Sequence, residues 1–209
     1  LERREGKVRA SFRLGTDLSQ VAPLHSNSLI AIRGVGLVGA GFMISNEEAN
    51  ILSRRYSRIY KTFLRPYFNG KDITQRSRSF WVLDLEHFGE SQLQRELPDV
   101  YQLVTERVRP FREQNKEIYR RNNWWKFGRQ HRELRDGIFG LKEYIATPMT
   151  AKHRIFTQIQ EPTIPDQGLV AIALSHRPML SILSSKFHGI WAFSVGGTLE
   201  DRPRYNQTQ

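Results

Sequence analysis

The chain has 209 residues, of which 39% are hydrophobic and 25% charged, the composition of an ordinary water-soluble globular protein with room for a sizeable core. It contains no cysteine, which excludes disulfides, thiolate metal sites and cysteine catalysis. Its formal net charge of +11 favours an anionic partner.

No stretch of the sequence reaches the roughly 18 consecutive apolar residues that a membrane span needs. No apolar segment follows the basic start of the chain, so a signal peptide is not expected either. We therefore expect no membrane partner and a cytoplasmic location.

The first part of the chain, residues 1–28, is polar and irregular, and we expect it to be a linker that follows an upstream domain. Residues 29–44 are apolar and interrupted by glycines, which predicts strands with bulges or tight corners. Ser45 and Glu48 then have the spacing of a capping box, which predicts a short helix to about Arg55.

The glycine run Gly34-Val-Gly36-Leu-Val-Gly39 has the spacing of a dinucleotide-binding turn. Its context does not fit, because no helical pattern begins at the third glycine. Arg54 and Arg55 also stand where an acidic residue should hold a ribose. We interpret these glycines as backbone requirements of the strands.

Further along, residues 59–67 are apolar and aromatic and end at the turn signal Asn69-Gly70. Residues 80–85 read as another strand. Pro98 is well placed to begin a long helix that runs to about Arg121.

We expect Pro110 to kink this long helix. A shorter helix is predicted from Arg132 to Phe139.

Residues 104–135 form the most basic stretch of the chain. They hold ten Lys and Arg against four acids, and ten minus four leaves +6. The aromatic residues interleaved with them are Phe111, Tyr119, Trp124, Trp125 and Phe127. This pattern favours a polyanion whose bases can also be packed against, while the alternative is a solvated helix face. We expect Trp124, Trp125 and Trp191 to lie in the core.

Residues 141–159 predict a strand, a connection and a second strand, because two runs rich in β-branched and aromatic residues flank a short polar loop. Lys152, His153 and Arg154 cluster near this connection. Strand-supported loops are where proteins place binding groups, and these cations suggest an anionic ligand.

The last third predicts a buried strand at 169–174 and a helix from Pro178 to Trp191. We expect Leu180, Leu183, Phe187 and Trp191 to face inward on that helix, and residues 194–209 to form a loop. The irregular alternation of elements predicts a single mixed α/β (α+β) domain with a mixed sheet, one long kinked helix and several shorter helices.

Catalytic and metal-binding patterns are missing from the sequence. The six histidines show no metal-ligand spacing, and no nucleophile elbow or Gly-rich cofactor loop with a matching acid occurs. We therefore expect no catalytic residue, no metal and no cofactor in this chain.

Six fragments, taken together, resemble one protein family. They are residues 39–49, 66–73, 124–129 (Trp-Trp-Lys-Phe-Gly-Arg), 145–156 (Ile-Ala-Thr-Pro-Met-Thr-Ala-Lys-His-Arg-Ile-Phe), 183–191 and 201–205. In this order and spacing they are similar to the target recognition domain of MmeI-like type II restriction–modification enzymes. The resemblance covers residues 29–209, and the family pattern continues beyond it, so a domain truncated at its C-terminus is expected.

The resemblance implies sequence-specific reading of double-stranded DNA in the major groove. It also implies an upstream methyltransferase domain in the same polypeptide, which uses S-adenosylmethionine to methylate adenine, with or without an endonuclease domain. Residues 1–28 would be the linker from that domain.

The resemblance and the charge pattern together give candidate DNA contacts. Lys152, His153 and Arg154 are placed at the DNA, and Thr150 and Ala151 at base edges. The second candidate edge is Arg129, His131 and Arg132, and the candidate phosphate contacts are Lys71, Arg202 and Arg204. For each Arg the alternative is a surface ion pair. The alternative function is a non-specific nucleic-acid-binding module for RNA or DNA.

Overall fold

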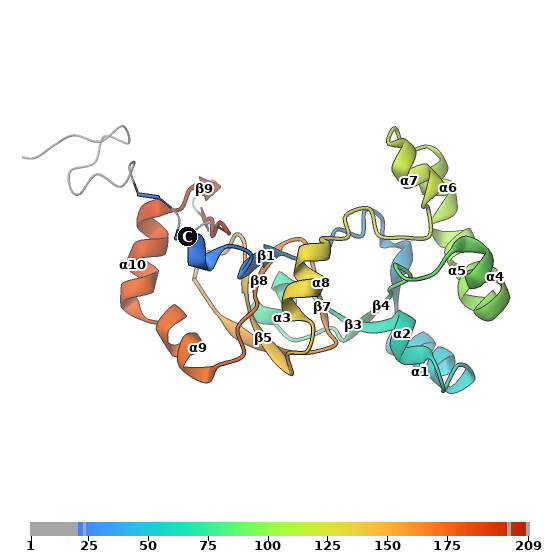
Figure 1. Ribbon diagram of the computed structural model, residues 1–209, viewed down its shortest axis with the longest axis horizontal. Helices are drawn as coiled ribbons and strands as arrows, with labels where there is room; N and C mark the ends of the chain where they lie inside the picture. Colours follow the sequence, from blue (N-terminus) through green and yellow to red (C-terminus); the bar gives the residue numbers. More distant parts are fainter. Residues whose placement is uncertain (1–20, 23, 200–201, 208–209) are drawn as a thin grey trace, which may run out of the picture.

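Two four-stranded sheets lie at the centre of the part of the chain that the computed structural model describes, namely residues 21–22, 24–199 and 202–207. Helices α4 to α7 lie at one end of the sheets, and α9 and α10 lie at the other (Figure 1). The predicted mixed α+β class is confirmed.

The first sheet is antiparallel throughout, in the order β1-β8-β5-β6. Its strands are β1 (Ala31–Arg33), β8 (Leu169–Ile172), β5 (Glu143–Pro148) and β6 (Thr157–Gln160). All four residues of β8 are buried, as expected for a central strand covered on both faces. The predicted strand pair around residues 141–159 is thus present as β5 and β6.

The second sheet is mixed, in the order β2-β4-β3-β7, with β7 parallel to β3. Its strands are β2 (Met43–Ile44), β4 (Phe80–Leu83), β3 (Leu64–Phe68) and β7 (Ile164–Pro165). Because residues 166–168 alone separate β7 from β8, the two sheets are joined by one short turn. This turn lies near the candidate site described below.

The α-helices in the described residues are α1 (Asn46–Arg55), α2 (Tyr60–Phe63), α3 (Gly70–Thr74), α4 (Glu90–Glu96), α5 (Pro98–Arg107), α6 (Arg109–Glu113), α7 (Ile118–Asn122), α8 (Arg132–Ile138), α9 (Arg177–Leu183) and α10 (Lys186–Val195). Short 3-10 turns occupy His25–Asn27 and Ala40–Phe42. The capping box that predicts α1 is confirmed, since Ser45 and Glu48 each accept a hydrogen bond from the other's backbone N–H.

The single long helix expected between Pro98 and Arg121 is wrong. The segment forms α5, α6 and α7 in succession, and the first break falls at Val108. Pro110 has no N–H to donate and its ring crowds the preceding turn, so it starts a new helix instead of kinking an old one.

The single helix expected between Pro178 and Trp191 also differs from the structure. Ser184 and Ser185 divide it into α9 and α10, and the Ser185 side chain caps α10 by accepting from the His188 N–H. Leu180 and Leu183 of α9 are partly buried, as expected. Phe187 and Trp191 are 88% and 37% exposed, so neither lies in the core.

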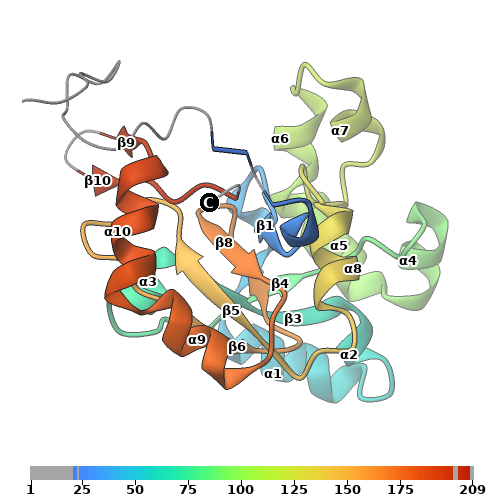
Figure 2. The same cartoon turned by 60° about the vertical axis from the view of Figure 1, so that its left-hand side comes forward.

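A loop was expected for residues 194–209, but the described part of this segment also contains strands. Two short antiparallel strands, β9 (Thr198–Leu199) and β10 (Arg202–Pro203), pair with each other. They lie beside α10 in both views (Figures 1 and 2).

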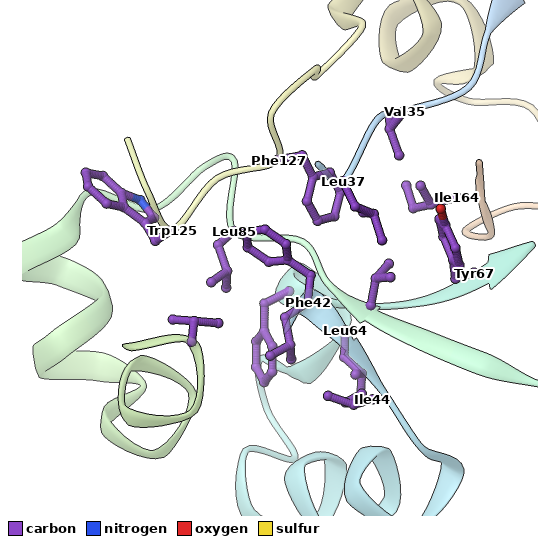
Figure 3. Close-up of a cluster of buried hydrophobic side chains, with 14 of the residues drawn as sticks. Val35, Leu37, Phe42, Ile44, Leu64, Tyr67, Leu85, Trp125, Phe127 and Ile164 are labelled. Atoms are coloured by element: carbon purple, nitrogen blue, oxygen red, sulfur yellow. The ribbon is translucent and has the colours of Figure 1, made fainter. Parts of the chain in front are cut away.

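The main core contains buried residues of both sheets and of the helices beside the second sheet. Phe42, Leu64, Leu85 and Phe127 meet there (Figure 3), and the Phe42 and Phe127 rings pack edge to face at 5.2 Å. Trp124 and Trp125 are buried, as predicted for both. The Trp125 indole N–H donates to the Phe88 carbonyl at 2.9 Å, which satisfies its polar atom.

The glycine run is explained by close backbone contacts. A Cβ on Gly34 would lie 2.1 Å from the Asp166 carbonyl oxygen, and Gly39 has a φ of +124°, which L side chains rarely adopt. Both positions therefore disfavour any side chain, in agreement with the structural role expected from the sequence.

Helix α8 is fastened to the end of β4 by a buried ion pair. The two terminal guanidinium nitrogens of Arg135, Nη1 and Nη2, donate to the Asp84 carboxylate at 2.6 and 2.9 Å. The Asp84 side chain is only 2% exposed, so its charge depends on this partner.

We expect Arg135→Ala to lower the free energy of unfolding by about 3–5 kcal/mol, because it leaves the Asp84 carboxylate buried without its cation. Urea denaturation of the purified chain measures the change. The control is Arg95→Ala, which removes an exposed pair with Glu96 and should leave stability unchanged. Equal effects of the two substitutions would contradict the role given to Arg135.

Candidate nucleic-acid interface

A groove of about 780 Å³ lies between helix α3, the turn after β7 and the loop after β5. The residues lining it are Met43, Tyr67, Asn69, Gly70, Lys71, Thr74, Arg78, Pro148, Met149, Thr150, Ala151, Lys152, Asp166, Gly168 and Arg202. These side chains come from segments far apart in the sequence. Five of the predicted contacts, Lys71, Thr150, Ala151, Lys152 and Arg202, are among them.

The Asn69-Gly70 signal begins a helix here instead of a hairpin turn. The Asn69 side chain accepts from the Lys71 N–H at 2.9 Å, and the Asp72 carboxylate accepts from the Asn69 N–H at 2.9 Å. This reciprocal cap starts α3 at the edge of the groove. Asp72 also accepts from the Arg78 N–H, so one buried carboxylate positions the segments that carry Lys71 and Arg78.

The loop after β5 is paired with the end of the chain. The Tyr205 N–H donates to the Met149 carbonyl at 2.7 Å, and the Ala151 N–H donates to the Pro203 carbonyl at 3.4 Å. Thr150 and Arg204 form an antiparallel bridge between these hydrogen bonds. Two segments fifty residues apart therefore make a short two-stranded ribbon, which brings Arg202 and Arg204 beside Thr150 and Ala151.

Arg154 does not face outward, in contrast to the sequence prediction. Its guanidinium donates to the carbonyls of Pro148 and Pro203 and to the Thr147 hydroxyl. It also lies over the Tyr205 ring, 5.1 Å from the ring centre, and burial lowers the pKa of Arg154. One of the hydrogen-bond acceptors of Arg154 is a carbonyl 49 residues away in the sequence, so the sequence pattern gave no sign of this contact. In this structure Arg154 positions the ribbon instead of presenting its charge.

Lys152 and His153 remain exposed at the tip of the same loop. Lys152 lines the groove, and both residues also line an adjoining hollow of about 300 Å³ that reaches α9 and α10. The loop therefore lies between two concave surfaces.

The second predicted edge, at Arg129, His131 and Arg132, does not line the groove. The backbone of Arg129 pairs with Gly36, and its side chain is exposed. His131 has a left-handed backbone (φ +46°) and is half-buried, and burial lowers its pKa. Arg132 pairs with Glu86 at 3.3 Å, the ion-pair alternative weighed for each Arg.

Sequence reasoning missed several groove residues, including Asn69, Thr74, Arg78 and Asp166. Arg78 could have been found from the polar run at residues 75–79, which has no apolar periodicity. Asp166 gave no such signal, because its place depends on Tyr67. The Tyr67 hydroxyl donates to the Asp166 carboxylate, and burial together with this carboxylate raises the pKa of Tyr67.

The groove is positively charged. Its lining residues include the cations Lys71, Arg78, Lys152 and Arg202 against one acid, Asp166. A concave surface with an excess of one sign of charge concentrates ligands of the opposite sign. Hydroxyl, amide and backbone groups on the same surface can form hydrogen bonds, so the site suits an extended polyanion better than a small molecule.

Within the described ranges, no helix is long and apolar enough to cross a membrane. The same residues contain no group of three His, Asp or Glu side chains close enough to hold a metal ion.

Comparison with known proteins identifies the family of this chain and a solved structure with a similar fold. Residues 25–209 match the family model of the MmeI target recognition domain. The fold is similar to that of a solved structure, the Type IIL restriction-modification enzyme MmeI in complex with DNA, with a TM-score of 0.70 and 20% sequence identity. The match covers 94% of this chain and 26% of that one, so the chain spans about a quarter of the length of the solved relative. No curated protein gave a significant match.

We expect Arg154→Ala to lower the free energy of unfolding by about 1.5–3 kcal/mol, because it removes hydrogen bonds from a charged donor to buried carbonyls. Lys152→Ala, two residues away at an exposed position, should leave stability unchanged. Thermal or urea denaturation compares the two variants. If Arg154→Ala unfolds like the parent chain, Arg154 does not hold the ribbon.

Proposed function

Because this chain belongs to the MmeI target recognition domain family, we propose that it reads a specific sequence of double-stranded DNA through base edges in the major groove. This reading allows a separate domain of the same polypeptide to methylate adenine with S-adenosylmethionine as its cofactor. The chain itself supplies recognition and no chemistry. Any DNA cleavage would belong to another domain, and the polypeptide would work in the cytoplasm.

The observation that carries this proposal is the ribbon formed by residues 149–151 and 203–205 at the edge of a cationic groove. The major groove of B-DNA, about 12 Å wide, admits a two-stranded β-ribbon as well as a helix. A ribbon in that position lets short side chains approach base edges while longer cations reach the phosphates on either side.

The roles of the residues follow from their length and position. Thr150 and Ala151 sit where the ribbon is paired and are half-buried, so they are suited to base edges, with the Ala methyl suited to thymine. The exposed cations suit phosphates, which fix the register without carrying sequence information. They are Lys71, Lys152 and Arg202 at the groove and Arg204 on the ribbon. Arg154 holds the ribbon in place through its hydrogen bonds to the carbonyls of Pro148 and Pro203.

A non-specific nucleic-acid-binding module is the second candidate. Exposed aromatic side chains favour it, since Phe111 and Tyr119 are 57% and 52% exposed in the most basic part of the chain. Aromatic rings beside cations are typical of proteins that stack single-stranded bases. The experiment below separates the two candidates.

We expect binding of duplex DNA by the chain to weaken steeply with salt, with a slope of about −0.9 in log K against log salt for each phosphate neutralised. Lys71→Ala and Lys152→Ala should each make this slope shallower by about 1 and weaken all sequences alike. Fluorescence anisotropy at several salt concentrations measures both quantities. A flat salt response of the parent chain would exclude a DNA-binding role.

A matched control and a specificity arm complete the experiment. Lys142→Ala removes an exposed cation at the other end of β5 from the groove, and should leave the slope unchanged. Thr150→Val should change the preference at one base pair by about 1–3 kcal/mol without changing the slope. Equal affinity of the parent chain for every duplex, or a preference for single strands, would favour the second candidate.

A further inference from the structure

The loop between α3 and β4, residues 75–79, is polar and exposed along its whole length. Its sequence is Gln-Arg-Ser-Arg-Ser, and its second arginine, Arg78, lines the cationic groove. A run of exposed polar side chains at the wall of a concave cationic surface is suited to contact with a ligand, not to packing. We call these five residues the 75–79 loop.

The backbone of the 75–79 loop is fixed by a buried carboxylate. The Asp72 side chain is 2% exposed and accepts from the N–H groups of Asn69 and Arg78, each at 2.9 Å. Ser79 has a left-handed backbone (φ +52°), which residues other than glycine rarely adopt. Backbone strain of this kind persists where the surrounding structure imposes it, and it is common at ligand-binding sites. The loop therefore holds Arg78 at a defined place in the groove.

The Arg78 guanidinium is positioned, but its hydrogen-bond donors are not used. It lies over the Phe80 ring, 5.1 Å from the ring centre, and its Nε is 3.6 Å from the Asp72 carboxylate, which is beyond hydrogen-bond length. Within the described residues this guanidinium donates no hydrogen bond to the protein, whereas those of Arg135 and Arg154 do. Arg78 can therefore bind an anion without losing a hydrogen bond.

Arg78 lies on the side of the groove away from the ribbon. A backbone hydrogen bond of 2.8 Å joins Met149 of the ribbon to the turn at 166–168, and a second one joins that turn to Phe68 of β3. Strand β3 pairs with β4, which begins just after the 75–79 loop. Three strand spacings of about 4.8 Å thus separate the ribbon from the start of β4, roughly 15 Å in all. This span is comparable with the major groove of B-DNA, which is about 12 Å wide and bordered by the two phosphate backbones.

We propose that Arg78 binds a backbone phosphate of the duplex whose major groove holds the ribbon. The inference rests on the proposed function and adds the element that contacts the strand on the far side of the groove. The ribbon covers the base edges, so a phosphate is the group that reaches Arg78. The planar guanidinium fork matches two phosphate oxygens, and Asp72 and Phe80 position it in advance. Contacts on both sides of the ribbon fix its register on the DNA.

The test compares two arginines of the same loop. Arg78→Ala should make the slope of log K against log salt shallower by about 1 and weaken all sequences alike, by about tenfold at low salt, because one phosphate contact is lost. Fluorescence anisotropy with a duplex of mixed sequence at several salt concentrations measures both quantities. The matched control is Arg76→Ala. Arg76 is exposed and does not line the groove, so its loss should leave slope and affinity unchanged.

A conservative variant separates binding from a structural role. Arg78→Ala keeps the backbone N–H that donates to Asp72, so the fold should be kept, which near-ultraviolet circular dichroism checks. Arg78→Lys keeps the charge and loses the fork, so it should keep the salt slope of the parent chain while affinity falls about three- to tenfold. A merely structural Arg78 would instead give the parent slope in both variants and lower stability in both.

A second measurement uses the absence of cysteine from this chain. Arg78→Cys places one thiol in the loop, and its alkylation by a maleimide is followed by mass spectrometry with and without the duplex. Duplex at about ten times the Kd of this variant leaves about a tenth of the chain free, so alkylation at position 78 should slow about tenfold. Phe139→Cys, at a position 87% exposed outside the groove, should react alike in both conditions.

The inference and the proposed function fail on different results. An unchanged salt slope in Arg78→Ala, or equal alkylation at position 78 with and without the duplex, would overturn the inference and leave duplex binding by the parent chain intact. A slope lowered as much by Arg76→Ala would also overturn it, because the contact would then be general charge attraction. A parent chain that binds no duplex would overturn the proposed function and this inference with it.

Discussion

The candidate interface depends on one half-buried cation, Arg154, which donates to backbone carbonyls and a hydroxyl. The Arg154 guanidinium joins the carbonyl at the end of β5 to the Pro203 carbonyl near the end of the chain. A hydrogen bond from a charged donor to a buried acceptor is worth more than one between neutral groups, and an unsatisfied carbonyl there would carry a desolvation cost. The ribbon that carries Arg202 and Arg204 therefore keeps its place through Arg154, although only two short stretches of backbone are paired.

A second Arg that donates to backbone carbonyls lies in the core, and it changes how the net charge should be interpreted. Arg112 is fully buried, donates to the carbonyls of Leu37 and Lys126, and has its pKa lowered by burial to about 10. Other cations of the basic stretch pair with acids, namely Arg107, Arg109, Arg120, Arg132 and Arg135. Much of the positive charge between residues 104 and 135 is thus paired with acids within the chain. Lys71 and Lys152, which are exposed at the groove, are the better indication of a polyanionic partner.

Local signals were predictable from the sequence, and contacts between distant segments were not. The cap at Ser45 and the strands β5 and β6 depend on neighbouring residues, so the pattern was sufficient. Lys71, Thr150 and Arg202, which were singled out from the sequence, all line the groove. The direction of Arg154 depends on a carbonyl 49 residues away, and no periodicity encodes that contact. Phe187 was expected inside because an apolar helical position normally is, but burial of one face of α10 left its other apolar face outside.

Helix α10 connects the position of Arg154 with the exposure of Phe187. Its inner face holds His188 against Tyr205, and the Tyr205 ring lies under the Arg154 guanidinium that fixes the ribbon. Its outer face exposes Phe187, Ile190 and Trp191. A reading surface must be held to within a fraction of an ångström, and a ten-residue helix with one buried face is a weak support by itself. The ribbon is therefore held by a chain of contacts, in which His188 of α10 packs on Tyr205, Tyr205 packs on Arg154, and Arg154 donates to the carbonyls of Pro148 and Pro203.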